Sequence, residues 1–99
     1  MRAKIEIPKA EIEAFSRRHH IRKLALFGSV LRDDFTPASD VDVLVEFEPG
    51  TRVGLRFFAL EQELSELLGR KVDLNTPGFL SAYFRDQVIA EAEPLYVAA

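Results

Sequence analysis

Apolar residues recur along this chain with two periods, one typical of strands and the other typical of helices. Alternating or continuous apolar segments predict strands over residues 24–27, 40–46 and 71–74. Apolar residues at helical spacing predict helices over residues 9–19, 57–68 and 80–92. Helices therefore alternate with strands along the sequence.

Three further segments carry weaker patterns. Ile5 and Ile7 predict a short edge strand that ends at Pro8. Residues 29–39 contain polar and proline positions that predict a short helix followed by a turn, and residues 95–97 predict a final strand. The mixed order predicts an α/β (α+β) fold, in which helices pack against a small mixed sheet.

Composition and charge limit the class of protein. The 99 residues, 47% of them hydrophobic and 29% charged, predict one globular domain over residues 1–99. The sequence has no cysteine, no signal-peptide pattern and no apolar run long enough for a membrane span, so a cytoplasmic protein is expected. The net charge of −3 argues against direct, charge-driven binding of nucleic acid.

Two aspartates, Asp40 and Asp42, stand two residues apart on a predicted strand. Side chains at that spacing point to the same face of the strand, about 7 Å apart. Two such carboxylates raise each other's pKa unless a cation lies between them, and Mg²⁺ prefers oxygen ligands. A solvated loop end is the alternative, but Val41 and Val43 commit the strand to a core.

A third aspartate, Asp73, lies between the apolar residues Val72 and Leu74. Alone it is as consistent with capping a turn as with catalysis. Three carboxylates on neighbouring strands, however, can hold two metal ions roughly 3.5–4 Å apart, an arrangement that supports in-line displacement at phosphorus. Together the three aspartates predict a metal-dependent phosphorus-transfer site.

The dipeptide Gly28-Ser29 follows a predicted strand and begins a predicted helix. Glycine lets the backbone approach a ligand closely, and the N-terminus of a helix offers free N–H groups to an anion. An ordinary strand-to-helix turn with Ser29 as the N-cap is the alternative, and it is favoured when this segment is considered alone.

Two adjacent histidines, His19 and His20, end the first predicted helix. Cationic side chains are favourable at that end of a helix dipole. The position favours a helix-terminal or solvated role over a metal-binding or catalytic one.

The combination of these motifs resembles the polymerase-beta-type nucleotidyltransferase superfamily. The resemblance rests on Gly-Ser, an arginine three residues later, Asp-x-Asp and a distal aspartate, carried by the segments at residues 26–32, 39–45 and 68–74. More narrowly, the chain is similar to the minimal nucleotidyltransferases (MNT) that act as antitoxins to HEPN-domain ribonucleases. The resemblance implies a polymerase-beta-like nucleotidyltransferase fold.

The resemblance also implies a role for each motif residue. Gly28 and Ser29 would hold the triphosphate of ATP. Asp40 and Asp42 would coordinate two Mg²⁺ ions, and Asp73 would bind one of them and help to activate the acceptor hydroxyl.

The basic position of the motif is Arg32, which would either contact phosphate or brace the motif helix against a carboxylate. The bracing role is slightly favoured. Many superfamily members have Ala-Arg-Gly where this chain has Leu31-Arg32-Asp33, so the shape of this loop is expected to differ.

The implied function is transfer of AMP from ATP to a tyrosine hydroxyl on a partner HEPN-type toxin, so that the chain acts as its antitoxin. One alternative is an antitoxin that inhibits its toxin by occlusion alone. A second is a nucleotidyltransferase that modifies a small molecule such as an aminoglycoside, which would need a separate subunit or a dimer to complete its pocket. A homo- or hetero-oligomer is compatible with each of these functions.

Overall fold

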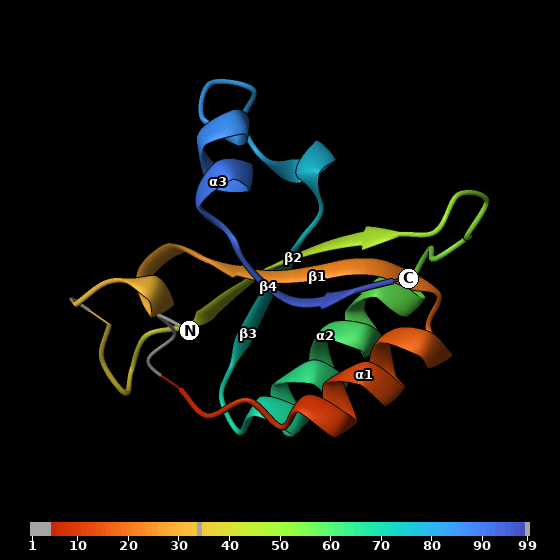
Figure 1. The fold of residues 1–99 in the computed structure, drawn as a ribbon, viewed down its shortest axis with the longest axis horizontal. Helices are drawn as coiled ribbons and strands as arrows, with labels where there is room; N and C mark the ends of the chain where they lie inside the picture. Colours follow the sequence, from red (N-terminus) through yellow and green to blue (C-terminus); the bar gives the residue numbers. More distant parts are fainter. Residues whose placement is uncertain (1–4, 34, 99) are drawn as a thin grey trace.

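The computed structural model describes residues 5–33 and 35–98, in which a four-stranded sheet is covered by helices (Figure 1). The strand order is β3-β2-β1-β4. β1 pairs antiparallel with both β2 and β4, whereas β2 and β3 are parallel. The strands are β1 (Ile21–Phe27), β2 (Val41–Phe47), β3 (Val72–Asn75) and β4 (Glu93–Val97).

Three α-helices surround the sheet in this part of the chain, and they do not share one face. α1 and α2 lie together on one face, whereas α3 rises on the opposite side (Figure 1). The helices are α1 (Lys9–Arg18), α2 (Arg56–Leu68) and α3 (Arg85–Glu91), with single 3₁₀ turns η1 (Gly28–Leu31) and η2 (Pro77–Phe79).

The core lies between the sheet and the layer of α1 and α2. Leu60, Leu64 and Leu68 recur every four residues on α2, so they form one buried stripe. The stripe belongs to the same buried cluster as the alternate residues of β2, each of which is completely buried: Val41, Val43 and Val45. The alternation of β2 therefore commits one face of that strand to the core and leaves the other face for Asp42.

The central strand β1 is buried more completely. Leu24, Ala25 and Leu26 are consecutive and have no exposed surface. Both faces of this strand are therefore covered, as its continuous apolar run predicts. β1 begins at Ile21, three residues before the predicted segment.

The α/β fold class is confirmed, with corrections at the weaker segments. The predicted strand at Ile5 and Ile7 is wrong, because these side chains pack against the core without strand pairing. The short helix and following turn predicted within residues 29–39 are confirmed, as the 3₁₀ turn η1, which ends at Leu31, and a turn at residues 36–39. Residue 34 of this segment lies outside the described residues.

The C-terminal helix is shorter than predicted, because residues 82–84 form a turn and α3 begins only at Arg85. The last strand begins at Glu93 and contains Pro94. Proline is tolerated there because β4 is an edge strand.

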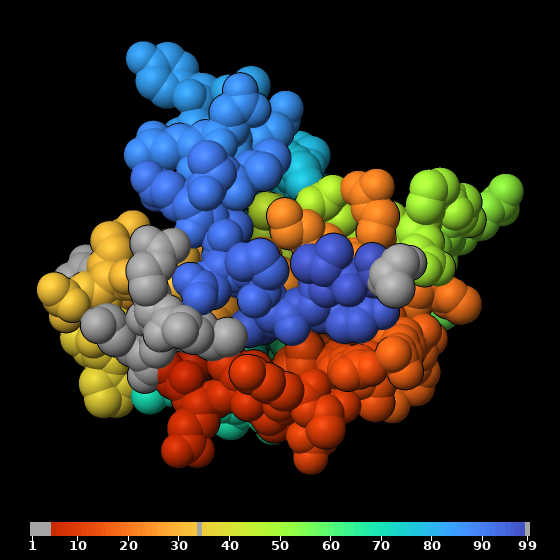
Figure 2. All heavy atoms as spheres, viewed as in Figure 1, coloured from red at the N-terminus to blue at the C-terminus, as the bar shows by residue number. Residues whose placement is uncertain are grey.

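The segment containing η2 and α3 stands out as a lobe (Figure 2). α3 has no buried residue, and Tyr83, which precedes it, is 97% exposed. No helix formed by the described residues is long and apolar enough to cross a membrane.

Candidate functional site

The parallel pairing of β2 and β3 brings two aspartates side by side. Asp42 and Asp73 are register partners. Partners on adjacent parallel strands point to the same face and lie about 4.8 Å apart between Cα atoms. Val72 and Leu74 are buried under the helices, so Asp73 between them faces the opposite, open side of the sheet.

The third predicted carboxylate, Asp40, precedes β2 directly and is 47% exposed. Its Oδ2 lies 4.0 Å from Nζ of Lys71, the residue before β3. The tight turn before Asp40 is closed by two bonds, from Ser39 N–H to the Thr36 carbonyl (2.9 Å) and from Thr36 N–H to Ser39 Oγ (3.1 Å). This turn fixes where the chain enters β2.

Electrostatics couple these aspartates. Burial raises the pKa of Asp42 above its ordinary value, and the negative charges of Asp73 and Asp40 raise that pKa further. The positive charge of Arg32 opposes the shift. The structure therefore brings Asp40, Asp73 and Arg32 within electrostatic reach of Asp42.

The turn after β1 lies directly against Asp42. Gly28 has a φ of +75°, and a Cβ added to it would lie 2.3 Å from Oδ2 of Asp42. Only glycine fits here, because any side chain would collide with the carboxylate in a backbone conformation that L-residues rarely adopt. The sequence analysis expected this glycine to let the backbone approach a ligand; in the structure the backbone approaches the carboxylate of Asp42.

Ser29 and Arg32 belong to the same short turn. The Arg32 N–H donates to the Ser29 carbonyl at 2.9 Å and closes η1. Ser29 lies inside the turn, so it is not the N-cap considered from the sequence. Because η1 has a single turn, any anion bound here would depend on individual backbone N–H groups and not on the dipole of a long helix.

A cleft of 250 Å³ adjoins the aspartates through Gly28. One wall comes from the end of β1 and η1, and the other from α3. Its lining residues are Phe27, Gly28, Leu31, Arg32, Val88 and Glu91. The sequence did not predict Val88 and Glu91, because only the tertiary fold brings α3 beside η1.

Whether a divalent cation fits this site depends on the side chains that could bind it. No group of three His, Cys, Asp or Glu side chains within residues 5–33 and 35–98 is arranged to hold a metal ion. Mg²⁺, however, usually takes one or two carboxylates together with substrate phosphates and water. The adjacent Asp42 and Asp73 match that donor set, and a cation would relieve the repulsion that raises the pKa of Asp42.

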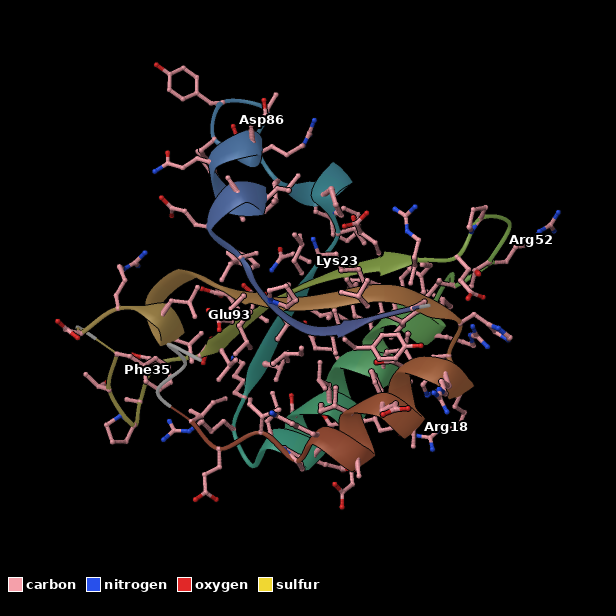
Figure 3. The ribbon with its side chains drawn as sticks, in the orientation of Figure 1. Arg18, Lys23, Phe35, Arg52, Asp86 and Glu93 are labelled. Atoms are coloured by element: carbon pink, nitrogen blue, oxygen red, sulfur yellow. The ribbon has the colours of Figure 1, made fainter. Side chains whose placement is uncertain are left out.

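Neither histidine lies at the site: His19 caps the end of α1, and His20 follows in the turn, its Nδ1 3.8 Å from Oε2 of Glu48. His19 Nε2 lies 3.1 Å from Oε1 of Glu63 on α2, and Arg18 pairs with the same carboxylate. Burial lowers the pKa of His19, and the charge of Arg18 lowers it further. Arg18 lies on the side of the sheet opposite to Asp86 of α3 (Figure 3). The contacts of Arg18 and His19 with Glu63 link α1 to α2.

The chain is similar in sequence to a known protein family. The family model for the nucleotidyltransferase domain matches residues 9–95, which is most of the chain. This chain belongs to the nucleotidyltransferase domain family. The resemblance seen in the sequence is confirmed, and the chain is a nucleotidyltransferase.

Two relatives are similar to this chain over most of their length. MJ0128 of Methanocaldococcus jannaschii, a candidate protein adenylyltransferase, is 37% identical over 93 residues, which cover 93% of this chain and 92% of that protein. The protein adenylyltransferase MntA of Thermococcus cleftensis is 38% identical over 74 residues, which cover 75% of this chain and 74% of that protein.

Two solved structures share the fold. A candidate minimal nucleotidyltransferase superimposes with a TM-score of 0.72 at 35% identity and covers 87% of each chain. A complex of a tri-AMPylated HEPN toxin from Shewanella oneidensis with its MNT antitoxin superimposes with a TM-score of 0.64 at 24% identity. That match covers 91% of this chain and 70% of the other. The polymerase-beta-like nucleotidyltransferase fold is thus confirmed.

Proposed function

We propose that this chain transfers AMP from ATP to a tyrosine hydroxyl of a HEPN-type ribonuclease and thereby acts as its antitoxin. The observation that carries the proposal is the placement of Asp42 and Asp73 as register partners on the open face of the sheet. The relatives support the protein acceptor, since MntA of Thermococcus cleftensis is a protein adenylyltransferase. The AMPylated HEPN toxin bound to an MNT antitoxin supports the choice of partner.

The site residues take the following roles in this proposal. Asp40, Asp42 and Asp73 would hold two Mg²⁺ ions, which supply positive charge for the phosphates and lower the barrier to displacement at phosphorus. Gly28 and Ser29 would donate backbone N–H groups to the triphosphate. Val88 and Glu91 would extend the nucleotide site into the cleft beside Gly28.

Arg32 has one role that the geometry favours. It lies in the wall of the cleft, and its positive charge opposes the raised pKa of Asp42. We therefore assign to Arg32 the role of offsetting the negative charge of the aspartates, with phosphate contact as its second role. Both roles depend on its positive charge.

The reaction requires a hydroxyl oxygen to attack the α-phosphorus of ATP while the bond to the bridging oxygen of pyrophosphate breaks. Asp73 is exposed on the open face, so its carboxylate can accept the proton that the hydroxyl loses. Asp42 is more buried, so it is better suited to hold charge in place. Alignment of acceptor and triphosphate would supply much of the remaining rate enhancement.

The protein acceptor approaches from the side of the sheet that α1 and α2 leave uncovered (Figure 1). A large substrate can reach Asp73 there without entering a deep pocket. In this function the chain would act in the cytoplasm, where ATP and the ribonuclease are found.

The test is a transfer assay with a HEPN-type toxin as acceptor, using ATP labelled at either the α- or the γ-phosphate. The proposal predicts that α-label but not γ-label becomes attached to a tyrosine of the HEPN protein. Asp42→Asn and Asp73→Asn should abolish labelling. Asp86→Asn, a change of the same kind on the exposed α3, should not.

The other outcomes separate the competing functions. A stable complex that silences the ribonuclease without any label would favour inhibition by occlusion. Label attached to an aminoglycoside, with none on the HEPN protein, would favour a small-molecule substrate. Either result would contradict the proposed function.

A further inference from the structure

The outer edge of β3 is bonded to side chains of α2. The Leu74 N–H donates to Oε2 of Glu61 at 2.8 Å, and the Val72 N–H donates to Oγ of Ser65 at 3.0 Å. Glu61 and Ser65 are one helical turn apart, so they project from the same face of α2. The Ser65 hydroxyl donates in turn to the Glu61 carbonyl at 2.8 Å.

These bonds lie on the side of β3 away from β2. The Val41 N–H of β2 donates to the Lys71 carbonyl at 2.9 Å, which places the backbone of residue 71 toward β2. Backbone groups alternate between the two sides of a strand, so residue 73 also faces β2 and residues 72 and 74 face α2. Asp73 therefore lies between two residues whose amides are held by α2.

Support from α2 matters because β3, the strand that carries Asp73, is the strand least held by the rest of the sheet. It has four residues and lies at an edge of the sheet, with β2 as its only strand neighbour among the described residues. A short edge strand opens more easily than a central one. A shift of β3 would change the distance between Asp73 and Asp42 directly.

We propose that Glu61 and Ser65 are positioning residues that hold the backbone of β3, and through it the carboxylate of Asp73, in register with Asp42. The inference rests on the proposed function for the role of Asp73. Both residues act through the backbone, because β3 turns Val72 and Leu74 toward the helices and Asp73 toward the open face. A competing explanation is that α2 only shields the edge of β3 from other strands.

The test compares Glu61→Ala, which removes the acceptor for Leu74, with Glu61→Gln, which retains an oxygen at that place. Two readouts do not depend on activity: amide hydrogen exchange at Leu74, and the affinity of the chain for Mn²⁺ in the presence of a non-hydrolysable ATP analogue. Glu61→Ala should speed exchange and weaken Mn²⁺ binding by roughly tenfold, as loss of groups that orient metal ligands does. Glu61→Gln should restore both.

Matched controls separate positioning from loss of stability. Glu66→Ala removes an exposed carboxylate from the same helix and should leave Mn²⁺ affinity unchanged. Ile12→Val destabilises the core from α1, far from β3 in sequence, and should also leave it unchanged. Ser65→Ala, which removes the acceptor for Val72, provides a second variant if Glu61→Ala does not fold.

Wild-type Mn²⁺ affinity in Glu61→Ala despite faster exchange at Leu74 would overturn the proposal and favour edge protection. A loss of affinity no larger than that of Ile12→Val would overturn it too. A wild-type chain that binds Mn²⁺ but transfers no nucleotide would contradict the proposed function, while the positioning test would still stand. A wild-type chain that binds no Mn²⁺ would contradict both.

Discussion

Two neighbouring strands each place one aspartate at the candidate site, but the protein holds them in different ways. Asp42 lies on β2, which has seven residues and is paired on both sides, with β1 and β3. Asp73 lies on β3, which has four residues and depends on α2 for its outer edge. The first aspartate belongs to the rigid centre of the sheet, and the second to its margin.

This difference matches the two tasks that transfer requires. A half-buried carboxylate in a strand paired on both sides keeps its position but is costly to ionise, which is why the pKa of Asp42 is raised. An exposed carboxylate at the margin can meet an incoming acceptor, but it needs support from elsewhere. Variants at these strands and the turns beside them test this contrast, and the largest effect is expected at Asp42.

Asp42→Asn should have the largest effect, a loss of transfer of about a thousandfold or more, because it removes a charge that is expected to hold metal at the reacting phosphate. The measurement is the initial rate of AMP transfer at saturating ATP and Mg²⁺. The fold should survive, since asparagine is nearly isosteric, and circular dichroism checks this. A rate within tenfold of wild type would remove Asp42 from the site.

Gly28→Ala should lower both stability and transfer. The added Cβ would collide with Oδ2 of Asp42, and the positive φ adds strain of about 1–3 kcal/mol. Gly50→Ala is the matched control, because Gly50 also has a positive φ, +83°, but open space around its Cβ position. Urea denaturation should show a larger loss for Gly28→Ala, and only that variant should lose transfer. Equal losses would show that the contact with Asp42 does not matter.

The pH dependence of stability should differ between the wild type and Asp42→Asn. The folded state raises the pKa of Asp42, so it binds this proton more tightly than the unfolded state does. The metal-free wild type should therefore lose stability relative to the variant as the pH rises from about 4 through the raised pKa. Thermal denaturation in the presence of a chelator checks this. A wild type that gains stability relative to Asp42→Asn toward neutral pH would contradict it.

Lys71→Ala should have the smallest effect. Its ammonium lies 4.0 Å from Asp40, but the lysine side chain is 80% exposed. Solvent and salt screen such a pair, so the stability should change by no more than about 0.5 kcal/mol. A loss well above that value in urea denaturation would show that Lys71 supports the turn into β2.

Much of the site could be predicted from the sequence because its signals are local. The alternation of residues 40–46 places Asp40 and Asp42 on one face of a strand and commits Val41 and Val43 to the core. The glycine at position 28 marks a close approach of the backbone. Both inferences need only the geometry of a single strand or turn.

The rest depends on contacts between distant segments. Val88 and Glu91 of α3 line the same cleft as η1 only once the chain has folded, and no local pattern indicates this proximity. The bond from Leu74 to Glu61 joins a strand to a helix that precedes it.

The most direct test of the central claim is paramagnetic broadening of backbone amide signals by Mn²⁺ together with a non-hydrolysable ATP analogue. The account predicts broadening centred on Gly28, Asp42 and Asp73 in the wild type, and its loss from these positions in Asp42→Asn. Broadening centred elsewhere, or unchanged by Asp42→Asn, would contradict the claim that these two strands form the nucleotide and metal site.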